Sequence, residues 1–159
     1  MTIYAAFLRG IMPMNPNMRN EKLKAVFESL GFSNVRTIIA SGNVIFAARS
    51  ENVEALEKKI ETALKKNLGI KSPAYIRSKK ELEQLIKKNP FKDAEHSKNS
   101  YLIVSFLRKK PWEICSTIDT TQTKGAEFMR AIEKQFGKDA TTRTWKTVQR
   151  IVKKMNEHY

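Results

Sequence analysis

The chain has 159 residues, of which 30 are lysine or arginine and 16 are aspartate or glutamate, so its formal net charge is +14. With 41% hydrophobic and 29% charged residues, the composition excludes a disordered chain and indicates one folded domain or two small ones. Apolar runs such as residues 3–8 are far shorter than the ~20 residues of a membrane span. The single cysteine, Cys115, excludes an internal disulfide, so we expect a cytoplasmic protein without a membrane partner.

The first half of the chain alternates strand and helix patterns. Strands are expected at residues 3–8, 35–40, 44–48 and 73–77. Apolar residues recur at helical spacing from Leu23 to Leu30, before Gly31, and again over 53–68, before Gly69. The order strand, helix, strand, strand, helix, strand is the split βαβ pattern of a ferredoxin-like fold, whose strand order is 4-1-3-2.

The second half starts with Ser78 and Glu81 at capping-box spacing, which predicts a helix ending at Asn89-Pro90. A strand buried on both faces is expected at 101–107, short strands at 116–119 and 140–142, and a helix ending at Gly137. Thr144 is a suitable N-cap for a last helix through Met155. We therefore predict an α+β protein with two ferredoxin-like subdomains and antiparallel sheets, at 1–78 and 79–159, the second either complete or abbreviated.

The same order of helix, glycine, strand and Arg-Thr occurs in both halves of the sequence. It occurs at Gly31 with Arg36-Thr37 and at Gly137 with Arg143-Thr144. The recurrence is compatible with two related halves and also with chance.

The sequence lacks the motifs of most cofactor-dependent enzymes. Its six glycines form neither a Walker loop nor a Rossmann fingerprint, and His96 and His158 have no further ligand at metal-binding spacing. Cys115 has no histidine nearby in sequence, and acids such as Glu57 and Glu61 lie beside lysines, as in solvated ion pairs. We expect no metal, no cofactor and no catalytic residue, which favours a protein that is not an enzyme.

Several strings together resemble a known family over almost the whole chain. They are residues 8–11 (LRGI), 15–23, 30–32, 35–37, 41–44 (SGNV), 77–78, 89–91 (NPF) and 141–148, with its Thr-Arg-x-Trp core. In combination they are similar to the bacterial domain-of-unknown-function 1697 family. This resemblance implies two ferredoxin-like α+β subdomains and implies no activity.

One candidate site lies at the end of the first predicted sheet. In the predicted topology, the end of strand one, the start of the first helix and the turn between strands two and three meet there. Helix N-termini and turn amides attract anions, and arginine adds a bidentate donor. The candidate anion-binding residues are Arg9, Asn17, Arg19, Ser41, Gly42 and Asn43. The alternative is structural: Gly42 and Asn43 form the turn, Arg9 pairs with a carboxylate and Asn17 caps the helix.

The last helix is the second candidate surface. Its apolar residues share one side, and Trp145 among them is expected in the core rather than stacked on a base. Basic residues occupy the opposite side, and no acid occurs between Asp139 and Glu157. The candidate phosphate-binding residues are Arg143, Lys146, Arg150, Lys153 and Lys154. The alternative is a solvated helix face. An RNA-recognition motif is disfavoured, because Val44-Ile45-Phe46 supplies only Phe46 as an aromatic residue.

Three classes of function follow from these patterns. The first is a non-catalytic module that binds polyanions such as nucleic acid. The second is an enzyme or sensor for a small phosphorylated or anionic ligand at the Arg9 end of the first sheet. The third is a structural or protein-interaction role as a homo-oligomer.

Overall fold

The computed structural model describes residues 1–157, so His158 lies outside the described residues. The chain divides into two compact units. Unit 1 contains Met1–Leu82 together with the segment from Ile151 onward, and unit 2 contains Glu83–Arg150. The sequence patterns placed a boundary after residue 78 and the whole last helix in the second part, whereas the division falls within the helices Lys79–Lys88 and Trp145–Met155.

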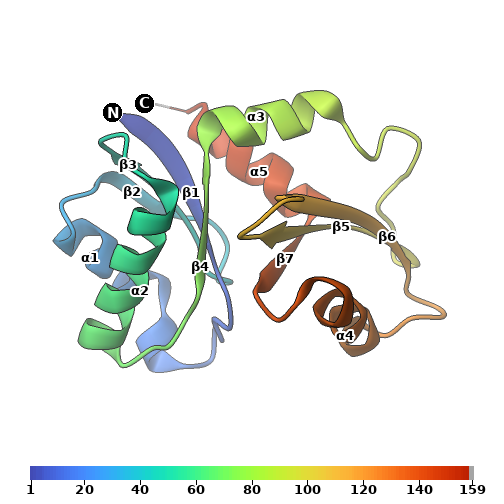
Figure 1. Cartoon of the computed structure of the whole chain (residues 1–159), viewed down its shortest axis with the longest axis horizontal. Coiled ribbons are helices and arrows are strands. Elements are labelled where there is room, and N and C mark those ends of the chain that lie inside the picture. Colours follow the sequence, from blue (N-terminus) through green and yellow to red (C-terminus); the bar gives the residue numbers. More distant parts are fainter. Residues whose placement is uncertain (158–159) are drawn as a thin grey trace. The chain divides into compact units, whose positions relative to one another are not determined.

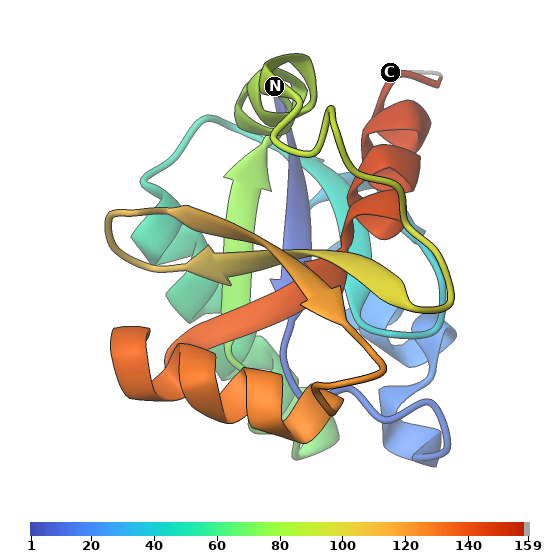
Figure 2. The same ribbon diagram turned by 90° about the vertical axis from the view of Figure 1, so that its right-hand side faces the viewer.

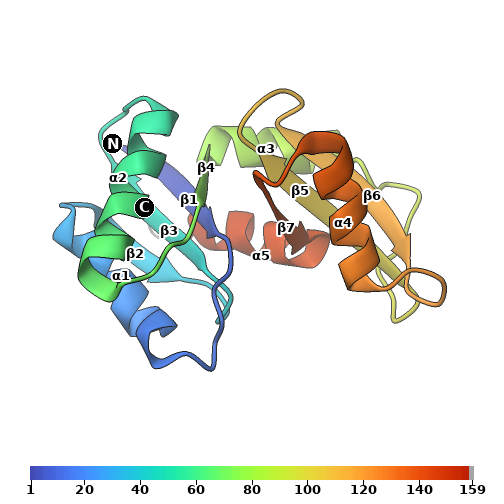
Figure 3. The same ribbon diagram turned by 60° about the horizontal axis from the view of Figure 1, so that its bottom comes forward.

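Unit 1 contains a four-stranded antiparallel sheet with two helices on one face (Figures 1 and 3). Its elements are β1 (Thr2–Leu8), the short helix η1 (Pro16–Met18), α1 (Asn20–Ser29), β2 (Ser33–Thr37), β3 (Asn43–Ala48), α2 (Val53–Leu68) and β4 (Ala74–Ser78). The strands lie in the order β2-β3-β1-β4, which is the predicted order 4-1-3-2.

The core of unit 1 lies between this sheet and the helices α1 and α2. Alternate residues of β1, β3 and β4 point to the helices, as the two-residue period of a strand requires. Phe46 of β3 lies at the centre, with its ring 4.6 Å from that of Phe32 and 5.4 Å from that of Phe27. Phe46 is fully buried, so this residue cannot stack on a base from outside.

The edge strand β4 has its outward amides occupied by carboxylates. Ala74 N–H donates to Glu61 Oε1 at 2.9 Å, and Ile76 N–H donates to Glu57 Oε2 at 3.0 Å. Ser78 N–H donates to Glu81 Oε2 at 2.7 Å, within the predicted capping box, which is confirmed by the Glu81 N–H bond to Ser78 Oγ. The expectation that Glu57 is a solvated partner of lysines was wrong, because α2 directs its side chain to the sheet edge and Glu57 is only 5% exposed. Glu61, which is half-buried, reaches the same edge.

Unit 2 contains a three-stranded antiparallel sheet in the order β6-β5-β7 (Figure 2). Its strands are β5 (Ser100–Leu107), β6 (Glu113–Asp119) and β7 (Ala140–Thr144), with α4 (Gly125–Phe136) between β6 and β7. Helix α4 packs Ile132 against Leu107 and Ala140. The helices α3 (Lys79–Lys88) and α5 (Trp145–Met155) directly follow β4 and β7. Strand β6 is longer than the short strand expected at 116–119.

The two units repeat one arrangement of strands. In unit 1, β1 is antiparallel to β3 and β4, and α2 connects those two neighbours; in unit 2, β5, β6, β7 and α4 are connected in the same way. The registers also agree, since Phe7 pairs with Tyr75 and Phe106 pairs with Thr141. Two sequence patterns coincide with these positions: Phe-Leu-Arg at 7–9 and 106–108, and Ala-x-x-Arg-Ser/Thr at 74–78 and 140–144.

The two units therefore share this strand arrangement, and unit 2 has no counterpart of α1 and β2 among the described residues. The recurrence of helix, glycine, strand and Arg-Thr in the sequence aligned different positions of the two halves. It equated Arg36 of β2, which pairs only with β3, with Arg143 of β7, which pairs with the central strand. By position in the sheets, the counterpart of Arg143 is Arg77.

Candidate ligand pocket and basic surfaces

The turn between β2 and β3 is held by its own hydrogen bonds. Asn43 Nδ2 donates to Ile38 O at 3.1 Å and to Ser41 Oγ at 2.9 Å, while Leu8 N–H donates to Gly42 O at 2.8 Å. Gly42 has a φ of +81°, and a Cβ at this position would lie 2.6 Å from Ile11 Cγ1. These contacts show that Gly42 and Asn43 form the turn.

The start of α1 reaches the same end of the sheet, as the topology predicts. Asn20 Nδ2 donates to Ile39 O at 3.4 Å, which joins the first residue of α1 to the turn. The α1 N-cap is the exposed Arg19, which provides no side-chain cap. The expectation that Asn17 caps this helix was wrong, because Asn17 lies in η1, where Asn15 is the cap, and its Oδ1 accepts from Lys22 Nζ.

Arg9 follows β1 at this end of the sheet. Its backbone is fixed on both sides, since Arg9 N–H donates to Pro73 O at 3.0 Å and Arg9 O accepts from Ser72 Oγ at 2.7 Å. The structure thus places Arg9, the Ser41–Asn43 turn and the start of α1 at one end of the sheet. An anion bound among them stays a prediction.

The basic residues proposed for the last helix differ in exposure. Lys146, Arg150 and Lys153 are exposed and form no ion pair with another described residue. Lys154 is half-buried and its Nζ lies 3.2 Å from Glu157 Oε2. Lys154 O also accepts a hydrogen bond from Arg36 Nη2 at 2.5 Å, so this residue is held within unit 1. Three of the predicted side chains are therefore free to contact phosphates.

Arg143 belongs to β7 and not to the exposed helix face. Its Nη1 donates to Thr141 Oγ1 at 3.0 Å and to Thr142 O at 2.8 Å. The residue keeps some accessible surface, but its guanidinium is largely desolvated, and this burial lowers the pKa of Arg143 to about 10. A pKa of that size leaves Arg143 charged at neutral pH.

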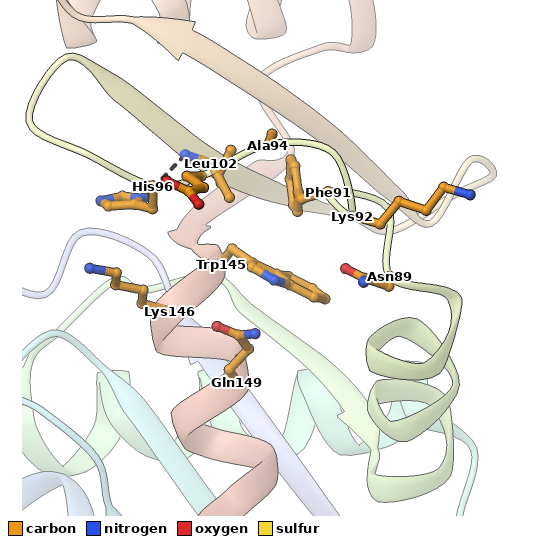
Figure 4. A pocket seen from close by; sticks show the side chains of 10 residues that line it. Asn89, Phe91, Lys92, Ala94, His96, Leu102, Trp145, Lys146 and Gln149 are labelled. Carbon is orange, nitrogen blue, oxygen red and sulfur yellow. Dashed lines mark hydrogen bonds between the residues drawn. The ribbon is translucent and has the colours of Figure 1, made fainter.

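A pocket of about 450 Å³ lies in unit 2, where the segment after α3 meets the first turn of α5 (Figure 4). Its floor contains the rings of Phe91 and Trp145, whose centroids are 5.2 Å apart. Figure 4 shows His96 and Lys146 on one side of Trp145, and Asn89 and Lys92 on the other. The whole lining consists of Asn89, Phe91, Lys92, Ala94, Glu95, His96, Leu102, Trp145, Lys146 and Gln149.

His96 has a fixed orientation at this pocket. Its Nδ1 accepts a hydrogen bond from Leu102 N–H at 3.2 Å, so the neutral ring carries its proton on Nε2. The imidazole also stacks on the Tyr101 ring at a centroid distance of 4.8 Å and an angle of 14° between planes. Packing and hydrogen bonding together present Nε2–H as the one free donor of this ring.

The sequence patterns included residues of this pocket but did not predict that they lie together. Two of the strings behind the family resemblance, at 89–91 and 141–148, contribute Phe91 and Trp145. They are far apart along the chain, so only the fold shows that they meet. Trp145 is 5% exposed, in agreement with the expected core position, yet it also lines the pocket.

Another aromatic residue went unnoticed in the sequence. Trp112 lies between β5 and β6 beside Lys109 and Lys110, and it is 47% exposed. Its carbonyl accepts from Leu107 N–H at 2.8 Å, which fixes the backbone of this connection. An exposed tryptophan next to two lysines is a combination that composition alone does not reveal.

Several kinds of site are absent from the described part of the chain. Within residues 1–157, no three histidine, cysteine or acidic side chains gather as metal ligands would. Among the same residues, no helix combines the length and apolar character needed to cross a membrane. Cys115 is half-buried, and burial, followed by the charge of Glu113, raises the pKa of its thiol.

The comparisons with known proteins identify a similar fold and, separately, a family. A conserved bacterial protein from Streptococcus pneumoniae, SP0830, has a similar solved structure, with a TM-score of 0.79, 17% sequence identity and coverage of 99% of each chain. At that identity the likeness shows a shared fold. No curated protein has a significantly similar sequence. Residues 1–136 match the family described as protein of unknown function (DUF1697), and the chain therefore belongs to this family.

Proposed function

We propose that this protein is a non-catalytic module that binds polyanions, nucleic acid in particular, through the exposed basic side of α5. The observation that carries the proposal is the set Lys146, Arg150 and Lys153, which are exposed, lack ion-pair partners among the described residues and follow one another at helical spacing. Residues at i, i+4 and i+7 lie on one face of a helix. Unpaired cations in such a row neutralise successive phosphates and release their counterions.

The net charge of +14 supports the same function, because it attracts any polyanion to the protein. We also propose a cytoplasmic location, since the one cysteine forms no internal disulfide and a reducing compartment suits a free thiol.

The salt dependence of DNA binding tests the role of α5. Three phosphate contacts predict that log affinity falls against log salt with a slope near −2.7, about −0.9 for each contact. Random duplexes are expected to bind about equally, because phosphate contacts carry no sequence information. The triple variant Lys146→Gln, Arg150→Gln, Lys153→Gln is expected to lose most of this slope. Lys154 stays unchanged because it already pairs with Glu157.

A matched control separates α5 from net charge. The variant Lys58→Gln, Lys65→Gln, Lys66→Gln removes the same three charges from exposed positions of α2. We expect it to keep the slope of the parent protein. If the two triple variants lower the slope equally, binding depends on net charge alone and the proposed surface on α5 is wrong.

A further inference from the structure

Strand β6 forms one edge of the sheet of unit 2, where it pairs only with β5 (Figure 2). Next to this ladder, Leu107 N–H donates to Trp112 O at 2.8 Å. Because backbone polar groups in an antiparallel ladder point alternately to the partner strand and away from it, those of residues 114, 116 and 118 point to β5. The N–H and C=O groups of Cys115 and Thr117 therefore point outward, and they form no hydrogen bond with another described residue.

The counterpart of this edge in unit 1 is covered by a strand. By position in the two sheets, β6 corresponds to β3, and Cys115 and Thr117 correspond to Ile45 and Ala47. Strand β2 pairs with both of these β3 residues and places Arg36 opposite Ile45. Because unit 2 has no counterpart of β2 among the described residues, no strand covers the same edge of β6.

The three other edge strands have features that hinder further pairing. On β4, outward amides donate to carboxylates of α2 and α3. Strand β2 has a register shift, and in β7 Thr142 O accepts a hydrogen bond from Arg143 Nη1. Strand β6 is regularly paired over its seven residues, and Glu113–Asp119 contains neither lysine nor proline. An edge without these features is a template for another strand.

We infer that β6 pairs with the β6 strand of a second copy of this chain, so that two sheets of unit 2 become continuous. Both copies present the same edge, as the contact of a twofold dimer requires. Full overlap of the antiparallel strands would place Glu113 opposite the partner's Asp119, and like charges directly opposite each other are destabilising. A register centred on Cys115 places Glu113 opposite the partner's Thr117 instead, and the outward backbone groups bond across the twofold axis.

The same register covers an exposed aromatic residue and brings opposite charges together. Trp112, which is 47% exposed, lies opposite the partner's Ile118. Asp119 lies beside the partner's Lys110, and both residues are exposed in the single chain. This complementarity of β6 with itself selects a second copy over an unrelated strand as the occupant. The inference concerns assembly, and it does not depend on polyanion binding.

Light scattering after gel filtration measures the oligomeric state of the full chain, freed of nucleic acid. We expect the mass to approach twice the monomer mass of 18.3 kDa as the protein concentration rises. A monomeric mass at every concentration up to the solubility limit would overturn the inference. The polyanion function would be unaffected by that result, because the exposed cations of α5 are present in a single chain.

Charge variants of Thr117 test whether β6 is the interface. Thr117→Glu places an acid opposite the partner's Glu113 at two symmetric positions, which is expected to weaken the dimer by roughly 2- to 30-fold, and Thr117→Lys is expected to strengthen it by a similar factor. Net charge alone predicts the opposite order, because two copies of a +14 chain repel each other. Thr62→Glu and Thr62→Lys make the same changes at an exposed threonine of α2. If the Thr117 variants behave like these controls, the interface is not at β6.

The single cysteine tests the register. In a hydrogen-bonded antiparallel pair the two Cα atoms are about 5.5 Å apart, within the range of about 4.4–6.8 Å found in disulfides. Oxidation with copper phenanthroline at alkaline pH is therefore expected to link two copies through Cys115. In the double variant Cys115→Ser, Thr117→Cys the thiols lie four residues apart along the ladder, about 13 Å, and no link is expected. A link in the double variant but not in the parent chain would exclude this register.

Discussion

Gly42 shows at the scale of one residue why the turn between β2 and β3 tolerates no side chain. Gly42→Ala combines a positive φ with a Cβ 2.6 Å from Ile11 Cγ1. We expect the free energy of unfolding to fall by about 2 to 4 kcal/mol, from left-handed backbone strain and overpacking together. Urea denaturation measures this loss.

Gly31 is the matched control for this prediction. It has a similar φ of +84°, but a Cβ there meets no atom within 4 Å. Gly31→Ala is therefore expected to cost only about 1 to 2 kcal/mol of backbone strain. Equal losses at the two positions would show that the contact with Ile11 is unimportant.

Cys115 is predicted to be an unreactive thiol. Burial raises its pKa, and the charge of Glu113 raises it further, while Lys88 partly lowers it. A thiol with a raised pKa is protonated at neutral pH, and only the thiolate reacts with iodoacetamide. The alkylation rate of the folded protein is expected to keep rising with pH beyond the point where the urea-unfolded chain reaches its maximum. Fast alkylation of the folded protein at pH 7 would contradict this and indicate an activated cysteine.

At the scale of the element, β4 depends on carboxylates supplied by α2. Glu57→Ala leaves the buried Ile76 N–H without an acceptor, which is expected to lower the free energy of unfolding by about 1 to 3 kcal/mol. Glu57→Gln keeps an acceptor oxygen and is expected to lose less. Glu54→Ala, an exposed position one turn earlier, is the control and is expected to change stability by about 0.5 kcal/mol or less. Thermal unfolding of the three variants tests whether the loss is largest for Glu57→Ala, smaller for Glu57→Gln and smallest for Glu54→Ala.

Local patterns in the sequence predicted most helices and strands. They failed where tertiary contacts determine the extent of a strand or the partner of a side chain. The helices α1 and α2, the capping box at Ser78 and the strand order of unit 1 follow from spacing and cap chemistry. Strand β6 was only partly recognised, because most of its residues are half-exposed and its sequence lacks a clear alternation. The role of Glu57 was missed because helical spacing predicts the side of α2 on which a residue lies. It does not predict which strand amide the side chain contacts.

The candidate pocket illustrates the same limit. The strings at 89–91 and 141–148 were recognised as distinctive, and Trp145 was correctly expected to be buried. Their meeting depends on the path of β5 and β7 between them, which no local pattern contains. By contrast, the exposed lysines of α5 were predictable, because the apolar side of an amphipathic helix defines its solvent side. The position of Arg143 was not predictable in this way. It lies in β7, directly before α5, where its side chain bonds to Thr141 and Thr142 rather than joining the exposed helix surface.

At the scale of the whole molecule, the two units share one plan at different lengths. Each has a central strand between two antiparallel neighbours. In each, the strand before a helix begins with a buried alanine and ends with an arginine and a hydroxyl residue, at Ala74–Ser78 and Ala140–Thr144. Ser78 caps α3 through Glu81 N–H, and Thr144 caps α5 through Thr147 N–H at 3.3 Å. The helix that carries Lys146 and Trp145 is thus placed by the same local device in β7 that places α3 after β4.

The discontinuity of unit 1 has a consequence for the newly made chain. Its first part ends at Leu82, and the segment from Ile151 onward is synthesised only after all of unit 2. At about 5 to 20 residues per second, a ribosome needs roughly 3 to 14 seconds to cross that interval. Throughout it, Arg36 lacks the Lys154 carbonyl that it binds in the finished protein. The first part of unit 1 is therefore synthesised without the segment that completes it, and the Arg36 contact with Lys154 forms only after unit 2 has been made.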